Sequence, residues 1–312
     1  MTRPVLLIAC LGVEIEPWLN GLSKADPHVE LRVWPDIGDA TEIEWVLAWN
    51  PPAELWSNLP NLKAIFSLGA GVDKFLSAGG LPENVPVVRM VDPSLVSSMT
   101  EYVLMRVLHY HRMMPQLESQ QARREWRKVV APLAGERRVG VMGLGQLGGA
   151  CARALVQLGF QVSGWSRSRK QIDGVKCFAG VDRLGAFAAR CEILVCLLPL
   201  TALTEGVLNA GFFASMPAGA SLINVSRGGS VVDEDLLIAL DSGHLSAATL
   251  DVFKVEPLPE DHPYWTHPKV TVTPHISALT NPFTASRVLM DNLRGHLNGE
   301  PLRDVVDRAL GY

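Results

Sequence analysis

The sequence has few cysteines and no CxxC pair among them. The five are Cys10, Cys151, Cys177, Cys191 and Cys196. An odd number at these spacings is not typical of a disulfide framework or of a zinc site, so we expect neither. No metal site of another kind is expected, because His109 and His111, the nearest pair of histidines, are two residues apart on a predicted helix and face different ways.

A long apolar run and an excess of positive charge are also missing. No stretch approaches the roughly 20 apolar residues that span a bilayer. The apolar N-terminal segment runs into Glu14 and Glu16 without a cleavage site, so we interpret it as a first β-strand. The net charge of −4 offers no basic surface for nucleic acid. We therefore expect a cytoplasmic protein that binds neither nucleic acid nor a membrane.

The composition that is present indicates a globular protein. Hydrophobic residues make up 48% of the 312 positions and charged residues 19%, which provides ample material for a core. A chain of this length favours two domains over one.

Short apolar runs alternate with helical patterns along the second half of the chain. We expect strands at 138–142, 160–165, 192–198, 221–225, 245–252 and 270–273. Helices are expected at 146–158, at 182–190 and from 233 to about 243. Such alternation predicts a parallel, doubly wound sheet.

The first hundred residues repeat this rhythm on a smaller scale. Strands are expected at 5–10, 31–34, 45–49, 64–68 and 87–90, followed by a long helix at 101–124 with a kink at Pro115 and a last helix at 282–298. The predicted fold class is α/β, with two doubly wound parallel-sheet (Rossmann-like) lobes. A dinucleotide-binding domain at 99–278 is inserted into a substrate domain formed by 1–98 and 279–312.

A glycine-rich turn follows the strand predicted at 138–142 and opens a helix. It consists of Gly143, Leu144, Gly145, Gln146, Leu147 and Gly148. A lone GxGxxG motif is weak evidence, but this strand–turn–helix context is the one that a dinucleotide site requires. Gly143 would make the tight turn, Gly145 would admit the pyrophosphate, and Gly148 would allow close helix–sheet packing.

A basic loop follows the next predicted strand. An NAD site would place a carboxylate here for the ribose 2′-hydroxyl, but the chain has Ser166, Arg167, Ser168, Arg169 and Lys170. Arginine can hold a 2′-phosphate with two hydrogen bonds, so the loop favours NADPH. The alternative is an ordinary solvated loop.

Five segments together resemble the D-isomer-specific 2-hydroxyacid dehydrogenase family. They are LGAGVD at 68–73, GLGQLG at 143–148, LPLTALT at 198–204, NVSRGG at 224–229, and DVFKVEPLP at 251–259 with TPHIS at 273–277. They occur in the family's order and span most of the chain. WNPP at 49–52, WSRSRK at 165–170 and the terminal DRALGY resemble the subgroup that reduces glyoxylate and hydroxypyruvate.

The resemblance implies three catalytic residues, and each has the chemistry for its role. His275 would donate the proton to the carbonyl oxygen, because imidazole changes charge near neutral pH. Glu256 would bond the other imidazole nitrogen and favour the charged ring. Arg227 would bind the substrate carboxylate and polarise the carbonyl group.

Further contacts are implied on both lobes. Pro199, Thr204, Ser226 and Asp251 would contact the cofactor, although Asp251 could equally be a buried cap at a strand end. The backbone of Ala70, Gly71 and Val72 would grip the substrate carboxylate. Trp49, with Trp56 as a second candidate, would limit substrate size unless it is ordinary core.

The expected activity is NADPH-dependent reduction of small 2-keto acids, with NADH as a second cofactor. Glyoxylate would give glycolate and hydroxypyruvate would give D-glycerate. Three alternatives stay open: a related dehydrogenase with another 2-keto acid, a D-3-phosphoglycerate or formate enzyme on the same frame, and a dinucleotide-sensing binding protein of the corepressor type. A homodimer is expected through an apolar face of helix 101–124 formed by Tyr102, Leu104, Val107, Leu108 and Met113.

Overall fold

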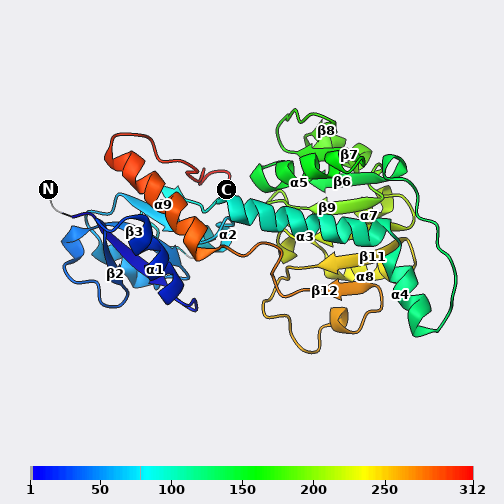
Figure 1. Cartoon of the computed structure of the whole chain (residues 1–312), viewed down its shortest axis with the longest axis horizontal. Helices are drawn as coiled ribbons and strands as arrows, with labels where there is room; N and C mark the ends of the chain where they lie inside the picture. Colours follow the sequence, from blue (N-terminus) through cyan, green and yellow to red (C-terminus); the bar gives the residue numbers. More distant parts are fainter. Residues whose placement is uncertain (1–2, 78, 312) are drawn as a thin grey trace. The chain divides into compact units, whose positions relative to one another are not determined.

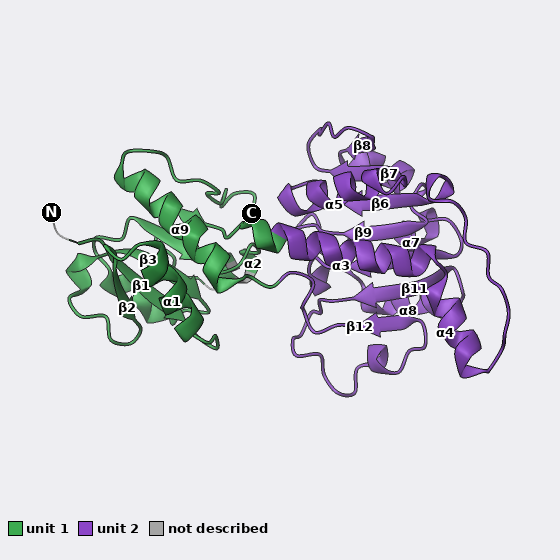
Figure 2. Ribbon diagram, viewed as in Figure 1, with its two compact units in different colours: residues 1–95, 279–312 green, residues 96–278 purple. Residues whose placement is uncertain are grey.

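The computed structural model describes residues 3–77 and 79–311, and the chain divides into two compact units (Figures 1 and 2). Unit 1 comprises Met1–Leu95 and Leu279–Tyr312, and unit 2 comprises Val96–Ala278. Unit 2 therefore begins at residue 96, whereas the sequence predicted that the inserted domain begins at residue 99. Each unit is built on a parallel sheet, so the predicted two-lobe α/β class is confirmed.

Unit 2 contains a seven-stranded sheet in the order β12-β11-β10-β9-β6-β7-β8, with every neighbouring pair parallel. Its strands are β6 (Arg138–Met142), β7 (Gln161–Ser166), β8 (Val175–Ala179), β9 (Ile193–Cys196), β10 (Ala220–Asn224), β11 (Leu245–Leu250) and β12 (Val270–Val272). All four residues of β9 are buried, as expected for a central strand covered on both faces.

Helices cover both faces of this sheet (Figure 1). They are α3 (Pro93–His111, of which the first three residues belong to unit 1), α5 (Gln146–Gln157), α6 (Leu184–Ala188), α7 (Ala210–Ser215) and α8 (Asp233–Asp241). A further helix, α4 (Met114–Ala122), follows α3. Val103 of α3 and Leu155 of α5 belong to one apolar core, whereas Phe187, Phe213 and Leu236 of α6, α7 and α8 belong to another. The sheet is thus the middle layer of a three-layer unit.

Unit 1 contains a five-stranded parallel sheet in the order β2-β1-β3-β4-β5. Its elements are β1 (Val5–Cys10), α1 (Glu16–Ala25), β2 (Glu30–Val33), β3 (Ile43–Trp49), β4 (Ala64–Ser67), α2 (Asp73–Ser77), β5 (Val87–Val88) and α9 (Pro282–Leu297). Helices α1 and α9 pack closely, since a Cβ at Gly21 would lie 2.6 Å from Ser286 Oγ. Helix α9, near the end of the chain, therefore packs in the same unit as β1.

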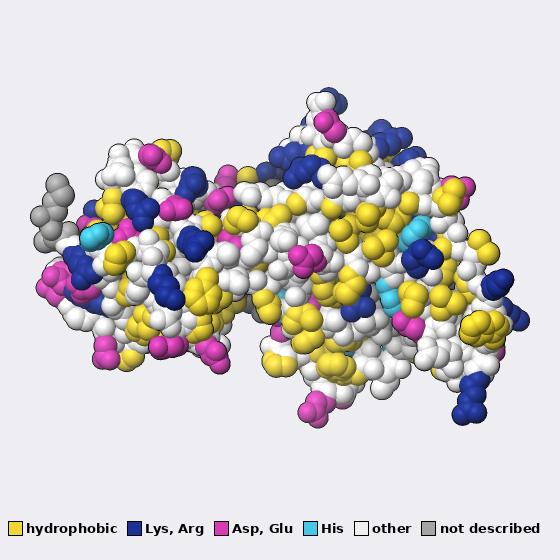
Figure 3. All heavy atoms as spheres, viewed as in Figure 1, with side chains coloured by type: hydrophobic (Ala, Val, Ile, Leu, Met, Phe, Trp, Pro, Cys, Tyr) yellow, Lys and Arg dark blue, Asp and Glu magenta, His cyan; other side chains and the backbone are white. Residues whose placement is uncertain are grey.

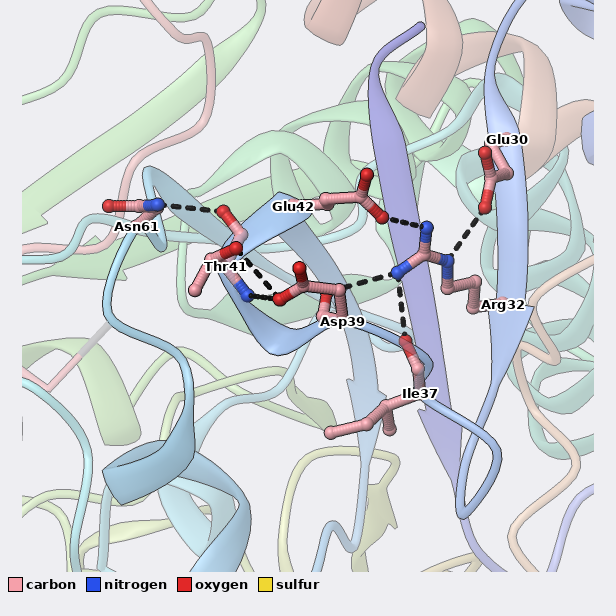
Figure 4. Close-up of polar contacts among 7 residues, drawn as sticks. All are labelled: Glu30, Arg32, Ile37, Asp39, Thr41, Glu42 and Asn61. Carbon is pink, nitrogen blue, oxygen red and sulfur yellow. Dashed lines mark hydrogen bonds and ion pairs between the residues drawn. The ribbon is translucent and has the colours of Figure 1, made fainter.

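The edge strand β2 is tied to the loop that follows it by Arg32 (Figure 4). Its Nε donates to Glu30 Oε1 at 2.7 Å, and its Nη1 donates to the carbonyl oxygens of Ile37 and Asp39, both at 3.0 Å. A second ion pair joins Arg32 to Glu42. These contacts order the connection from β2 into β3.

The predicted helix at 101–124 is wrong in its extent and in its kink. Helix α3 begins at Pro93 and ends at His111, and α4 begins afresh at Met114. Met113 between them has φ of 59°, a left-handed conformation that ends the first helix. Pro115 lies in the first turn of α4, where its missing N–H has no helical partner to lose, so it starts a helix in place of bending one.

Two of the five residues predicted to form a dimer face on this helix do not lie on the surface. Tyr102 and Val107 are buried in the core of unit 2, and Leu104 packs partly against the same core. Leu108 and the neighbouring Met105 are exposed.

In the part of the chain that the structure describes, no helix has both the length and the apolar character needed to cross a membrane.

Candidate active site

The carboxyl ends of the parallel strands of unit 2 meet at one edge of its sheet. The chain winds from β6 to β7 and β8 on one side, then returns to β9 on the other side and continues to β12. The winding direction thus reverses beside β6. Open α/β sheets bind ligands outside the carboxyl ends of the strands at such a reversal.

The glycine-rich turn lies at this reversal, between β6 and α5. Gly143 has φ of 103°, and a Cβ there would lie 2.7 Å from the Leu197 carbonyl oxygen. A Cβ on Gly148 would lie 1.8 Å from the Gly143 carbonyl oxygen. At Gly145, the N-cap of α5, a Cβ would meet no protein atom within 4 Å. Two glycines are therefore required by packing, whereas the third leaves space beside a helix N-terminus, where phosphate binds well.

The basic loop follows β7 on the neighbouring strand. Ser166 is buried and its Oγ donates to the Ser168 carbonyl oxygen at 2.8 Å, which folds the loop back on itself. Arg167, Ser168 and Arg169 are exposed. Lys and Arg side chains gather on the surface over β7 and β8 (Figure 3). A surface cavity of about 590 Å³ lies there, lined by Arg169, Lys170, Lys176, Cys177, Phe178, Ala179, Asp182 and Arg183.

Two further loops that the sequence assigned to the cofactor are held by their own side chains. Thr204 Oγ1 donates to the Pro199 carbonyl oxygen at 2.6 Å and accepts from the Thr201 amide at 2.8 Å, so it closes the loop after β9. Ser226 Oγ donates to Asn224 Oδ1 at 2.7 Å. Both hydroxyls are thus committed to loop structure.

Arg227 follows β10, and its backbone is fixed by two contacts. Asn224 Nδ2 donates to the Arg227 carbonyl oxygen at 3.1 Å. The next residue, Gly228, packs so tightly that a Cβ would lie 2.0 Å from the Phe253 carbonyl carbon. Gly228 therefore brings the segment of Arg227 against the loop after β11, which carries Glu256.

His275 and Glu256 form the predicted pair. His275 Nδ1 lies 2.9 Å from Glu256 Oε2, and the Phe253 amide donates to Glu256 Oε1 at 2.9 Å. The side chain of His275 is 46% exposed and that of Glu256 is 23% exposed. This arrangement holds the carboxylate in place, orients the imidazole and leaves the ring accessible, as a proton donor requires.

Asp251 organises the turn that carries His275. Its carboxylate is fully buried and accepts from the amides of Ile276 at 3.0 Å and Ser277 at 2.9 Å. The amide of His275 donates to the Asp251 carbonyl oxygen at 2.9 Å. Asp251 is therefore the buried cap that the sequence left open as an alternative, and its predicted cofactor contact stays a prediction.

The substrate residues predicted on unit 1 lie at the ends of β3 and β4. Among the described residues, the amides of Ala70, Gly71 and Val72 donate to no protein acceptor. Trp49 is partly buried, and a Cβ at Gly69 would lie 3.0 Å from its ring. Trp56 is 6% exposed and packs edge-on against Phe75 in the core of unit 1, so Trp49 stays the first candidate for a pocket wall.

Comparison with known proteins identifies the family. Residues 104–277 match the family model described as "D-isomer specific 2-hydroxyacid dehydrogenase, NAD binding domain". The chain belongs to this family. It is accordingly an NAD(P)-dependent oxidoreductase of the 2-hydroxyacid type, as predicted.

Relatives of similar length support the assignment. A glyoxylate/hydroxypyruvate reductase A of Serratia proteamaculans is 43% identical over 302 residues, covering 95% of this chain and 96% of the relative. A D-isomer-specific 2-hydroxyacid dehydrogenase of Xanthobacter autotrophicus Py2, solved with NADPH and MES, aligns over both whole chains with a TM-score of 0.96 and 41% identity. An NADPH-dependent glyoxylate/hydroxypyruvate reductase of Sinorhizobium meliloti, solved with NADP and sulfate, has a TM-score of 0.93 and 38% identity, covering 99% and 100% of the two chains.

The family's cofactor fits the residues on unit 2. The open space at Gly145 and the N-terminus of α5 suit a pyrophosphate. Among the described residues, no group of three His, Cys, Asp or Glu side chains is arranged to hold a metal ion.

Sequence reasoning missed the residues that position the predicted ones. Asn224 bonds the Arg227 carbonyl oxygen, Thr273 bonds Asp251 beneath the turn of His275, and Tyr102 bonds Thr273. Asn224 and Thr273 each lie at the end of a predicted apolar strand, and a polar residue at that position was the available signal. Tyr102 carried no signal other than a hydroxyl on an apolar helix face.

Proposed function

We propose that this protein reduces small 2-keto acids with NADPH, giving glycolate from glyoxylate and D-glycerate from hydroxypyruvate. The observation that carries the proposal is the 2.9 Å pair of His275 and Glu256 on the sheet edge that also holds the glycine-rich turn and Arg227. A dinucleotide-binding protein without activity could keep the same residues, so measurable turnover is what separates it from the proposed reductase.

The protein's own residues have distinct roles in the proposed reaction. Bound NADPH supplies the hydride that reaches the carbonyl carbon. Arg227 binds the carboxylate and draws electron density toward the keto oxygen. His275, held at Nδ1 by Glu256, donates its other ring proton to that oxygen as the C–O double bond becomes a C–O single bond. The products are the 2-hydroxy acid and NADP⁺.

The preference for NADPH is proposed from the charge of the basic loop. The loop contains three cations between Ser166 and Lys170 and no carboxylate. The Xanthobacter and Sinorhizobium relatives were solved with NADPH and NADP, which supports the same preference here. NADH would bind the same turn without the contacts to a 2′-phosphate.

Selectivity for small substrates is proposed to depend on both ends of the substrate. On unit 1, the amides of Ala70, Gly71 and Val72 would hold a substrate carboxylate, and the ring of Trp49 would limit the group beyond the keto carbon. The free amides and the partly buried indole support these roles.

A homodimer is proposed through a surface other than the buried face of α3. In the segment after α4, Trp126 is 100% exposed, Val130 90% and Leu133 72%. Contiguous exposed apolar surface marks interaction sites, so this segment is our candidate for the interface. A cytoplasmic location is also proposed, since all five cysteines are free thiols.

The test is a steady-state assay of NADPH oxidation with glyoxylate, hydroxypyruvate, pyruvate and phenylpyruvate. We expect turnover with the first two to exceed turnover with phenylpyruvate. NADPH binding without turnover on any 2-keto acid would reject the reductase in favour of the corepressor-type protein.

A further inference from the structure

Helix α3 presents two buried tyrosines to the sheet of unit 2, and both bond a threonine hydroxyl. Tyr102 Oη lies 2.6 Å from Thr273 Oγ1, and Tyr110 Oη lies 2.6 Å from Thr249 Oγ1. Tyr102 is 8% exposed and Tyr110 is 6% exposed. The two pairs have the same distance and both tyrosines are buried, but Thr249 is fully buried and Thr273 only partly. The pairs also differ in what lies beyond the threonine.

Beyond Thr273 the contacts lead to the turn of His275. Thr273 Oγ1 donates to Asp251 Oδ1 at 2.5 Å, and the Asp251 carboxylate accepts the amides of Ile276 and Ser277. Among the described residues, no hydrogen bond joins the Thr249 side chain to this turn. Only the Tyr102 pair therefore reaches the turn.

The direction of these hydrogen bonds follows from the chemistry of the groups. A hydroxyl has one proton, and Thr273 gives its proton to the carboxylate, so Thr273 accepts from Tyr102. Burial raises the pKa of Tyr102, and the charge of Asp251 raises it further, so the phenol keeps its proton. The guanidinium of Arg106 lies 5.4 Å from the centre of the Tyr102 ring and helps to fix it.

The turn needs such support because of its backbone. His275 has φ of 54°, in the left-handed region that costs energy for a residue other than glycine. A non-glycine residue keeps this conformation only where its surroundings hold it. The amide of His275 bonds the Asp251 carbonyl oxygen at 2.9 Å, so the position of the imidazole depends on Asp251.

We propose that Tyr102 is a positioning residue for the reduction, acting on His275 through Thr273 and Asp251. The inference rests on the proposed role of His275 as proton donor. Helix α3, which carries Tyr102, thereby fixes the orientation of the His275 imidazole. Loss of the phenol hydroxyl leaves Thr273 without its donor and lets the turn shift, and small displacements of a reacting group are costly in rate.

The experiment compares Tyr102→Phe with Tyr110→Phe, which removes an equivalent hydroxyl from the same helix. We expect Tyr102→Phe to lower kcat about 10-fold while KM and the NADPH Kd change less than about twofold. Both variants should lower the melting temperature by similar amounts, because each loses one hydrogen bond. Tyr110→Phe should nevertheless leave kcat within about twofold of the wild-type value. Thr273→Val should behave like Tyr102→Phe, whereas Thr273→Ser should keep most of the activity.

A double-mutant cycle tests whether the effect passes through His275. In a His275→Ala background, Tyr102→Phe should cause no further loss of kcat, since coupled residues are not additive. An independent readout is hydrogen exchange of the amides at 275–277, which Tyr102→Phe should speed and Tyr110→Phe should not.

Two results would overturn the proposal while leaving the proposed function intact. One is an equal effect of Tyr102→Phe and Tyr110→Phe on kcat and exchange. The other is the same fold-loss from Tyr102→Phe with and without His275. A wild-type protein without turnover would instead reject the proposed function, and this inference with it.

Discussion

At the residue scale, the proposed reduction depends on His275 as proton donor. Its Nδ1 is engaged by Glu256 at 2.9 Å, so Nε2 is the atom that can reach a carbonyl oxygen. We expect His275→Ala to lose about 10²–10⁴ in kcat, the usual contribution of a general acid. NADPH affinity, measured by fluorescence titration, should be retained. Near-normal turnover of this variant would remove the proposed mechanism.

The cofactor preference depends on the cations of the basic loop. Each charge-assisted hydrogen bond to a 2′-phosphate contributes about 1.5–3 kcal/mol. Arg167→Ala or Arg169→Ala should therefore weaken NADPH binding about 10- to 100-fold and barely change NADH binding. Arg112→Ala, which removes an exposed cation outside the loop, is the control. Equal kcat/KM for both cofactors in the unmodified protein would contradict the assignment.

Substrate size is the third property argued from single residues. The Trp49 ring is proposed to limit the group beyond the keto carbon. Trp49→Ala should then shift the ratio of kcat/KM values from glyoxylate toward phenylpyruvate by about 10-fold or more, since a single methylene in a hydrophobic pocket can change discrimination by that factor. Trp56→Ala should instead destabilise unit 1, because Trp56 packs against Phe75. An unchanged ratio in Trp49→Ala, with the fold intact by circular dichroism, would assign Trp49 to the core.

At the scale of elements, the glycine-rich turn allows packing and ligand binding to be separated. Gly148→Ala would place a Cβ against the Gly143 carbonyl oxygen, so we expect it to destabilise the protein by about 1–3 kcal/mol. Gly145→Ala meets no protein atom, so its melting temperature should change little while NADPH binding weakens about 10-fold or more. Thermal unfolding and calorimetric titration check both. Unchanged NADPH affinity in Gly145→Ala would mean that the pyrophosphate does not bind there.

Elements with a strong local pattern were the ones that the sequence could predict. The strand at 138–142 is β6 residue for residue, because its apolar run is bounded by charges before it and by glycine after it. Strand β8 was missed, since its alternating, half-exposed residues resemble a loop. The break between α3 and α4 was missed because it depends on the left-handed Met113, which no residue preference signals.

The site was predictable where a motif is continuous in sequence and not where it is assembled in space. The pairing of His275 with Glu256 followed from a resemblance, and the structure brings them together. The contact of Tyr102 with Thr273 joins residues 171 positions apart and has no local pattern. Positioning residues of this kind can be found only once the fold is known.

At the scale of the whole molecule, we expect a dimer. Trp126 is fully exposed, and truncating an aromatic residue in an interface commonly costs about 2 kcal/mol or more. Trp126→Ser should therefore weaken association about 30-fold or more, seen by analytical ultracentrifugation. Leu203→Ser, an exposed apolar position in the loop after β9, is the control. A wild-type monomer at micromolar concentration would overturn the prediction.

Transfer of the hydride to the substrate can be followed with an isotopically labelled cofactor. The protein is supplied with glyoxylate and with NADPH that carries deuterium at both C4 positions of the nicotinamide, and the product is analysed by mass spectrometry. If the protein is the proposed reductase, the glycolate gains a single deuterium on the former carbonyl carbon and forms in step with NADP⁺. Absence of labelled glycolate, with the cofactor bound and unchanged, would contradict it.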